Sequence, residues 1–318
     1  ELEIFGCTNP LSDNYNDEAT EDDASCDYPP SNQLINFSTG WGLWSTHIEP
    51  QDKDLSSIFS DIINSVIIIK DENGSVYWPE YNLNSIGDLQ NGAGYQIKMN
   101  NSAVLNISGS VVDSELNMFL NTGWSILGYL PLICNSISDM MTPIVDQIVI
   151  VKNADGAVYW PEFGLNSIVN MCPGKGYQIK MNNSVIFNYP SNNRFGFSMV
   201  NSNSNIYYEK PMNTGNNMII GLPITSWVIP PAIGDEIVAF DQYGLLVGSV
   251  VFNGSNIALT VWGDDLTTDE KDGLFIGERI VFHIWYNETN TTSELLVDTW
   301  DSGDNRYSID GISIASSI

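Results

Sequence analysis

Residues 74–86 read GSVYWPEYNLNSI, and residues 156–168 read GAVYWPEFGLNSI. A second pair of stretches is identical, because residues 94–102 and residues 176–184 both read GYQIKMNNS. Both pairs are 82 positions apart in the sequence. Similarity at one fixed spacing is typical of a duplicated structural unit. The sequence therefore predicts two tandem modules of the same fold.

Each copy begins at a Gly-Trp pair, Gly40-Trp41 or Gly123-Trp124. Apolar residues at helical spacing follow and predict one amphipathic helix per copy, with the stripes Leu55, Ile58, Phe59, Ile62 and Ile137, Met140, Met141, Ile144. A hydrophobic strand then leads through Asn73-Gly74 or Asp155-Gly156 into Val-Tyr-Trp-Pro, which is typical of a hairpin. The alternating segment GYQIKM closes each copy as a further strand.

The remainder of the chain has a different pattern. IGDEIVAFDQYGLLVGSVVFNGSNIALTVWGDD, residues 233–265, alternates apolar and polar residues between Gly-centred turns, as in a β-sandwich. We therefore expect a mainly β protein with α+β parts: two tandem small α+β modules followed by a β-sandwich. The predicted bounds are 1–33 for a Cys-bracketed acidic segment, 34–109 for repeat 1, 117–190 for repeat 2 and 206–318 for the sandwich.

The chain is strongly acidic, with 39 Asp and Glu against 11 Lys and Arg and a formal net charge of −28. Nucleic acid is not an expected partner, because phosphate binding needs clustered Lys and Arg. An anionic membrane surface is not expected either, and the sequence lacks the run of about eighteen apolar residues that spans a bilayer. The acidic surface favours either solubility alone or recruitment of divalent cations.

Two acidic stretches are candidates for calcium, which takes six to eight oxygen ligands. The first is the N-terminal segment, whose few apolar residues cannot build a core; its candidate ligands are Asp13, Asn14, Asn16, Asp17, Asp22 and Asp23. The second follows Trp262-Gly263, with candidates Asp264, Asp265 and Asp269. This second loop does not fit the EF-hand spacing. The alternative for both is a solvated turn.

Four cysteines occur, Cys7, Cys26, Cys134 and Cys172. They allow three disulfide pairings. The most economical pairing is Cys7–Cys26 and Cys134–Cys172, because each bond then lies within one module. Two disulfides indicate an oxidising compartment. Four free buried thiols in a cytosolic protein are the alternative.

These residues resemble modules of a known kind of protein. The pattern GCT…NYN…AT…DD.SC in residues 6–26 resembles short acidic repeats of secreted bacterial surface proteins and, more loosely, thrombospondin type 3 calcium repeats. The unit GW…VYWPE…NSI…GYQIKM resembles a repeated module of the same proteins, which gliding-type Gram-negative bacteria export by the type nine secretion route. GDEIVAFDQYGLLVGS…DGLFIGERIVFHIWY is similar to their carboxyl-terminal β-sandwich module. The resemblance implies architecture and compartment and is weak for activity.

The sequence favours a protein that is not an enzyme. Its two histidines, His47 and His283, are not accompanied by a GxSxG nucleophile motif. Glu80 and Glu162 could supply two carboxylates, but they occupy equivalent repeat positions, which favours a shared turn device. Four aromatic residues are candidates for sugar stacking, with core packing as the alternative: Tyr77, Trp78, Tyr159 and Trp160.

We therefore expect a secreted structural or adhesive surface protein, stabilised by disulfides and calcium, that could be a subunit of a filament or appendage. Exposed sheet edges would join copies into a homo-oligomer. A second hypothesis is a carbohydrate-binding accessory part of a larger secreted protein, with surface glycans as ligands. A third is a module of a virion surface fibre.

Overall fold

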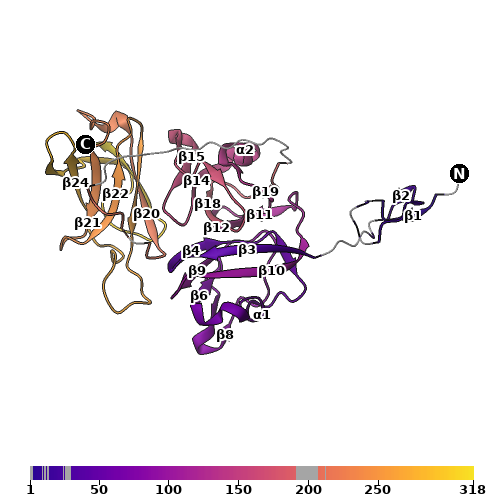
Figure 1. Cartoon of the computed structure of the whole chain (residues 1–318). Coiled ribbons are helices and arrows are strands. Elements are labelled where there is room, and N and C mark those ends of the chain that lie inside the picture. Colours follow the sequence, from indigo (N-terminus) through magenta and orange to yellow (C-terminus); the bar gives the residue numbers. More distant parts are fainter. Residues whose placement is uncertain are drawn as a thin grey trace.

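A computed structural model gives the fold and describes residues 3–8, 10, 12, 14–23, 25, 30–190, 207–211 and 213–318. Strands dominate, and most of them pair antiparallel, so the mainly β prediction is confirmed (Figure 1). In the N-terminal segment, β1 (Phe5–Gly6) and β2 (Glu21–Asp22) form a short parallel pair. Among the described residues, no helix has the length and apolar character needed to cross a membrane.

Each repeat contains one five-stranded antiparallel sheet, and both sheets have the same strand order. In repeat 1 the order is β4 (Gly40–Trp44), β9 (Tyr95–Met99), β6 (Val66–Lys70), β7 (Val76–Trp78) and β8 (Leu83–Asn84). In repeat 2 it is β12 (Gly123–Gly128), β18 (Gly176–Met181), β14 (Ile148–Lys152), β15 (Val158–Trp160) and β16 (Leu165–Asn166). The registers also correspond, since Trp41 pairs with Lys98 and Trp124 pairs with Lys180.

Smaller sheets complete each repeat. In repeat 1 there is one three-stranded sheet with the order β3 (Ser31–Phe37), β10 (Ala103–Val111) and β5 (Ile48–Pro50). In repeat 2 one pair is β11 (Met118–Leu120) with β19 (Val185–Phe187), and the other is β13 (Asn135–Ser136) with β17 (Asn170–Met171). Each repeat buries its own hydrophobic cluster.

The helices are shorter than the apolar stripes predicted. α1 (Leu55–Ile58) continues as the 3-10 helix η1 (Ser60–Ser65), and α2 (Ile137–Met141) continues as η3 (Thr142–Gln147). In α2 the change coincides with Pro143, which has no N–H to donate to an α-helical carbonyl. The predicted faces are nevertheless correct, because Leu55, Phe59 and all four stripe residues of repeat 2 are buried.

The Val-Tyr-Trp-Pro segment forms the expected hairpin in both repeats. After each Trp, Pro begins a short 3-10 turn, η2 (Pro79–Tyr81) or η4 (Pro161–Phe163). The next residue is left-handed, Asn82 with φ 49° or Gly164 with φ 61°. Asn and Gly tolerate this conformation, so the chain can reverse into β8 and β16.

The two repeats contact each other through reciprocal backbone bonds. Gly94 donates its N–H to the Ile126 carbonyl at 2.8 Å, and Trp44 forms an antiparallel bridge with Lys175 in the corresponding place. Glycine is required at both contacts, because a Cβ on Gly94 would lie 2.9 Å from the Leu127 oxygen. A Cβ on Gly176 would lie 2.8 Å from the Trp44 oxygen. The repeated Gly-x-Gly therefore serves close packing between repeats.

The C-terminal module contains two four-stranded sheets around one core, which fits the predicted sandwich. One sheet has the order β23 (Ile257–Trp262), β20 (Asn217–Leu222), β27 (Ile312–Ser317) and β26 (Thr299–Ser302). The other has the order β22 (Leu246–Val251), β21 (Glu236–Phe240), β24 (Val281–Tyr286) and β25 (Thr291–Leu295). The short turn η5 (Ile224–Ser226) follows β20. β20 and β27 run parallel, unlike the other pairs in these sheets.

One apolar cluster joins repeat 2 to the C-terminal module. Ile150, Val158 and Trp160 of repeat 2 pack with Ile219 of β20, and Ile312 and Ile314 of β27 lie against them. All six residues of β20 are buried, because one face of the strand covers the sandwich core and the other meets repeat 2. The relative position of these two modules is therefore fixed by packing as well as by polar contacts.

Candidate functional site

Each repeat presents a tryptophan with two lysine amines close to its ring. In repeat 1, Nζ of Lys70 lies 4.5 Å and Nζ of Lys98 lies 5.8 Å from the centroid of the Trp41 ring. Trp41 and Lys98 are cross-strand partners on β4 and β9, so their side chains leave the sheet on the same side. Cations are attracted to the face of an indole ring. We call Trp41, Lys70 and Lys98 the repeat 1 cluster.

Repeat 2 carries the same arrangement at the equivalent positions. Nζ of Lys152 lies 4.1 Å and Nζ of Lys180 lies 5.6 Å from the centroid of the Trp124 ring. Trp124 and Lys180 are again cross-strand partners. Trp124, Lys152 and Lys180 form the repeat 2 cluster. In an acidic chain with 11 basic residues, the two clusters together hold four lysines.

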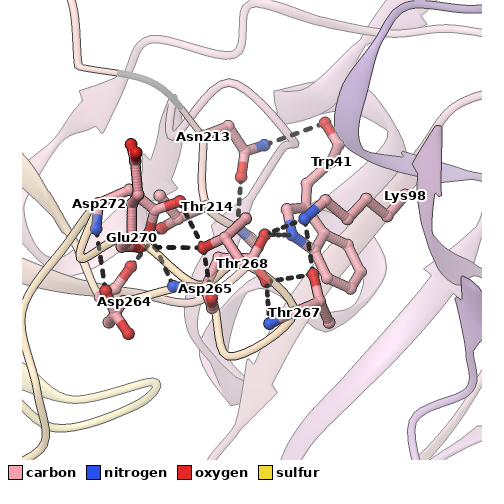
Figure 2. A network of polar contacts seen from close by, with 12 residues as sticks. Trp41, Lys98, Asn213, Thr214, Asp264, Asp265, Thr267, Thr268, Glu270 and Asp272 are labelled. Carbon is pink, nitrogen blue, oxygen red and sulfur yellow. Dashed lines mark hydrogen bonds and ion pairs between the residues drawn. The ribbon is translucent and has the colours of Figure 1, made fainter. Parts of the chain in front are cut away.

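The repeat 1 cluster binds a carboxylate of the C-terminal module (Figure 2). Oδ2 of Asp265 accepts hydrogen bonds from Trp41 Nε1 at 2.7 Å and from Lys98 Nζ at 2.5 Å. The other oxygen, Oδ1, accepts from the N–H of Thr267 at 3.0 Å and from its hydroxyl at 2.7 Å. Burial alone would raise the pKa of Asp265, but the hydrogen bonds from Lys98, Thr267 and Trp41 outweigh it and lower that pKa.

The loop that carries Asp265 is held by its own acidic residues. The N–H of Asp265 donates to Asp272 Oδ1 at 2.8 Å, and the N–H of Asp272 donates to Asp264 Oδ1 at 2.9 Å. The hydroxyl of Thr268 donates to the other oxygen of Asp272 at 3.2 Å. In Figure 2, Asp264 and Asp272 lie together on the side of the network away from Lys98. The loop thus presents Asp265 to repeat 1 in a fixed orientation.

The repeat 2 cluster binds Asp310 of the C-terminal module. Nζ of Lys152 donates to Asp310 Oδ1 at 2.8 Å and to Asn217 Oδ1 at 2.9 Å. Nε1 of Trp124 donates to the backbone carbonyl of Asp310 at 3.2 Å. Burial, the largest influence, lowers the pKa of Lys152, and Asp310 partly opposes it. Two repeat clusters therefore hold two aspartates of one module.

The structure describes five of the six calcium ligands predicted in the N-terminal segment. Asp13 lies outside the described residues, while Asn14, Asp17, Asp22 and Asp23 are exposed and Asn16 is half-buried. Asp23 accepts from the N–H of Ser25 at 3.0 Å, and hydrogen bonding with Ser25 lowers its pKa. Within the described part of the chain, no group of three or more His, Cys, Asp or Glu side chains could hold a metal ion.

In the second predicted calcium loop, one carboxylate contacts repeat 1. Asp265 faces Lys98 and Trp41, Asp264 accepts from the backbone of Asp272, and Asp269 is exposed. The sequence indicates this acidic cluster but not its partners, Trp41 and Lys98. The recurrence of Trp and Lys at equivalent repeat positions was the signal that could have found them.

The sugar-stacking prediction is wrong for three of its four residues. Tyr77, Tyr159 and Trp160 are 3%, 9% and 1% exposed, so their rings have no free face for a sugar. They pack in cores, which was the alternative. Trp78 is half-buried and packs edge-to-face on Tyr81, with 4.8 Å between the ring centroids.

The disulfide Cys134–Cys172 is present, so that part of the predicted pairing is confirmed. It joins two loops of repeat 2 that are 38 positions apart in sequence. Cys7 is buried in the N-terminal segment. Cys26 lies outside the described residues, so the Cys7–Cys26 pairing stays a prediction.

Both histidines are packed against other residues. His47 is buried, and burial lowers its pKa, which favours the neutral ring. His283 packs edge-to-face on Phe240, with 5.3 Å between the ring centroids.

No family model, curated protein or solved structure matches this chain. The two clusters and their aspartates are therefore the structural features that bear on function.

Proposed function

We propose that this chain is an extracellular structural or adhesive surface protein in which three modules form one rigid head. The observation that carries the proposal is the double attachment of the C-terminal module, through Asp265 to repeat 1 and through Asp310 to repeat 2. Contacts between modules of one chain are by default mobile unless the interface is large and apolar. Here the shielded ion pairs and the apolar cluster around Trp160 both hold the C-terminal module against the repeats. A head that transmits force would require such a rigid junction.

The compartment is also a proposal. The Cys134–Cys172 disulfide is compatible with an extracellular location, because disulfides persist in oxidising surroundings. Calcium remains a proposed cofactor of the N-terminal segment, on the basis of its oxygen-rich composition. The resemblance to type nine secretion cargo supports the same assignment.

The surface that contacts a neighbour is proposed to be the hairpin of repeat 1. In repeat 2 the equivalent hairpin, with Trp160, Phe163 and Leu165, is covered by the C-terminal module. In repeat 1 the same face carries Trp78, and Tyr81 and Leu83 are 65% and 45% exposed. Leu83 lies in β8, the edge strand of its sheet. A second copy would pair a strand with this exposed sheet edge, and its apolar side chains would cover Tyr81 and Leu83.

The test is assembly of the purified chain, measured by sedimentation and by electron microscopy at increasing concentration. Regular fibres or concentration-dependent oligomers are expected for the wild type. Replacing Tyr81→Ser together with Leu83→Ser should abolish them. The matched control is Phe119→Ser, which removes another exposed ring, 64% exposed, on β11. A wild-type chain that stays monomeric at every concentration, with calcium present, would contradict the assembly version.

A second candidate function is carbohydrate binding at the same hairpin. Trp78 and Tyr81 form an edge-to-face aromatic pair with one exposed ring, and aromatic rings stack on sugar faces. A glycan array probed with calcium present distinguishes carbohydrate binding at the hairpin from assembly through it. Binding that is lost in Tyr81→Ser favours the carbohydrate version, and a blank array removes it.

A further inference from the structure

Lys152 is buried at the junction of repeat 2 and the C-terminal module. Its side chain is 0% exposed, and its Nζ lies 2.9 Å from Asn217 Oδ1 and 2.8 Å from Asp310 Oδ1. Asn217, the first residue of β20, is 4% exposed. The Trp124 ring covers the amine from another side, with its centroid 4.1 Å from Nζ. A buried amine and a buried carboxamide therefore meet beside a carboxylate that reaches the solvent.

We propose that Lys152 and Asn217 become joined by an isopeptide bond between Nζ and Cγ, with Asp310 as the proton-transfer group. The ammonium of Lys152 first gives a proton to the Asp310 carboxylate. The lone pair of Nζ then attacks Cγ of Asn217, and Nζ passes a second proton to Nδ2. The bond from Cγ to Nδ2 breaks, and the departing ammonia takes the first proton back from Asp310 and leaves as ammonium. One amine and one primary amide become one secondary amide, and one ammonia is released without any oxidant or cofactor.

Three features of the junction favour this step. The nucleophile and the amide are held in contact on β14 and β20, and well-oriented groups react with effective molarities far above those of free reactants. Burial lowers the pKa of Lys152, which makes the neutral, nucleophilic amine more accessible. Exclusion of water protects the amide from hydrolysis while it reacts.

Asp310 is positioned for the proton transfer by the fold. It has a left-handed backbone, with φ 56°, and its N–H donates to the Asn217 carbonyl at 2.9 Å. Its side chain is 29% exposed, whereas that of Lys152 is fully buried. The carboxyl group therefore lies between the buried amine and the solvent, where it can release the proton together with ammonia.

The equivalent lysine of repeat 1 provides an internal comparison. Lys70 lies over the Trp41 ring at 4.5 Å, but there the carboxylate of Asp265 takes its hydrogen bonds from Lys98 and Trp41. The reactive set of lysine, asparagine and aspartate thus belongs to repeat 2. The resulting bond would link β14 to β20 and lock the C-terminal module to repeat 2 covalently. The inference is independent of the proposed surface function.

The test is the intact mass of the full-length chain after denaturation and disulfide reduction. The expected mass of the wild type is lower than the sequence mass by one ammonia, and a digest should contain one branched peptide that joins Lys152 to Asn217. Asn217→Ala and Lys152→Arg should each restore the full sequence mass. Lys70→Arg, the matched control in repeat 1, should leave the loss of ammonia unchanged.

Asp310→Asn should slow the reaction strongly, so that freshly purified protein has mainly the unlinked mass. A wild-type chain with the full sequence mass, and separate peptides for the two residues after prolonged incubation, would overturn the proposal and leave a plain ion pair. Loss of ammonia that persists in Asn217→Ala would place the modification elsewhere. Complete linkage in Asp310→Asn would overturn the role assigned to Asp310.

Discussion

Trp41 and Asp265 are separated by 224 positions in the sequence, yet the indole Nε1 of Trp41 donates a 2.7 Å hydrogen bond to Oδ2 of Asp265. The same oxygen accepts from Lys98, so one carboxylate closes the contact between repeat 1 and the C-terminal module. The contact is shielded, because the side chains of Lys98 and Asp265 are 12% and 5% exposed. Removing this contact should therefore lower the stability of the fold by more than removing an ordinary surface ion pair would.

Asp265→Asn should lower the free energy of unfolding by about 1.5–3 kcal/mol, the range for a hydrogen bond to a charged group. The substitution leaves the ammonium of Lys98 without its counter-ion in a shielded place. Urea denaturation followed by tryptophan fluorescence measures the change. Asp269→Asn, an exposed position on the same loop, is the control and should have little effect.

The contribution of Asp265 should depend on pH with a defined sign. The pKa of Asp265 is lower in the folded protein than in the unfolded chain, so its charge stabilises the fold above the unfolded-state pKa of about 3.9. The stabilisation is lost as the pH falls through the lower, folded-state pKa. The stability difference between wild type and Asp265→Asn should therefore be constant near neutral pH and shrink below about pH 4. A difference that grows on acidification would contradict this assignment.

Gly94→Ala and Gly176→Ala should each destabilise the contact between the repeats by roughly 1–3 kcal/mol. In both positions the new methyl group would meet a backbone oxygen of the other repeat, at 2.9 Å and 2.8 Å. Gly42→Ala is the control, because a Cβ there meets only Ile97 at an ordinary 3.7 Å. Thermal melting compares the three variants, and equal losses in all of them would argue against the reciprocal contact.

The Cys134–Cys172 disulfide closes a loop of 38 positions, which corresponds to a stabilisation of about 3–4 kcal/mol in the chain-entropy model. The double variant Cys134→Ser and Cys172→Ser should lose about this amount in chemical denaturation. Adding reductant should then change the wild type but leave the repeat 2 transition of the variant unaffected. An unchanged stability after removal of both thiols would show that the bond does not constrain repeat 2.

Calcium, if it orders the N-terminal segment, should raise the melting temperature of the protein by mass action. Calorimetric melting with excess calcium and with excess chelator makes the comparison. Asp17→Asn with Asp23→Asn, both exposed in that segment, should remove the shift, while Asp269→Asn in the C-terminal loop should retain it. Identical melting curves with calcium and with chelator would indicate that these carboxylates lie in solvated turns and do not bind calcium.

Local patterns predicted much of the fold. The strands are predicted correctly by the alternation of GYQIKM and by the Gly-centred turns. The helical stripes predict the core faces, because apolar residues repeat in sequence with the period of the structure that buries them. The helix lengths were overestimated, because in repeat 2 Pro143 lies where the α-helix changes to a 3-10 helix. The parallel pairing of β20 and β27 was also not predictable, since it joins strands from opposite ends of the C-terminal module.

The candidate site was less accessible from the sequence. The acidic neighbours of Asp265 mark it in the sequence, but its partners come from repeat 1 and depend on how two modules meet. Trp160 resembled a binding platform because a sequence pattern does not reveal which face a neighbouring module covers. The duplicated lysines were the usable signal, because few basic residues occur in this acidic chain and four of them recur at matching positions.

The most direct test of the contact between repeat 1 and the C-terminal module is a double-mutant cycle with Lys98→Met and Asp265→Asn, measured by chemical denaturation at low salt. If Asp265 holds the C-terminal module on repeat 1 through Lys98, the two substitutions should be coupled by about 1–3 kcal/mol. The double variant should then lose clearly less stability than the sum of the two single losses. Losses that add within about 0.5 kcal/mol would contradict the contact.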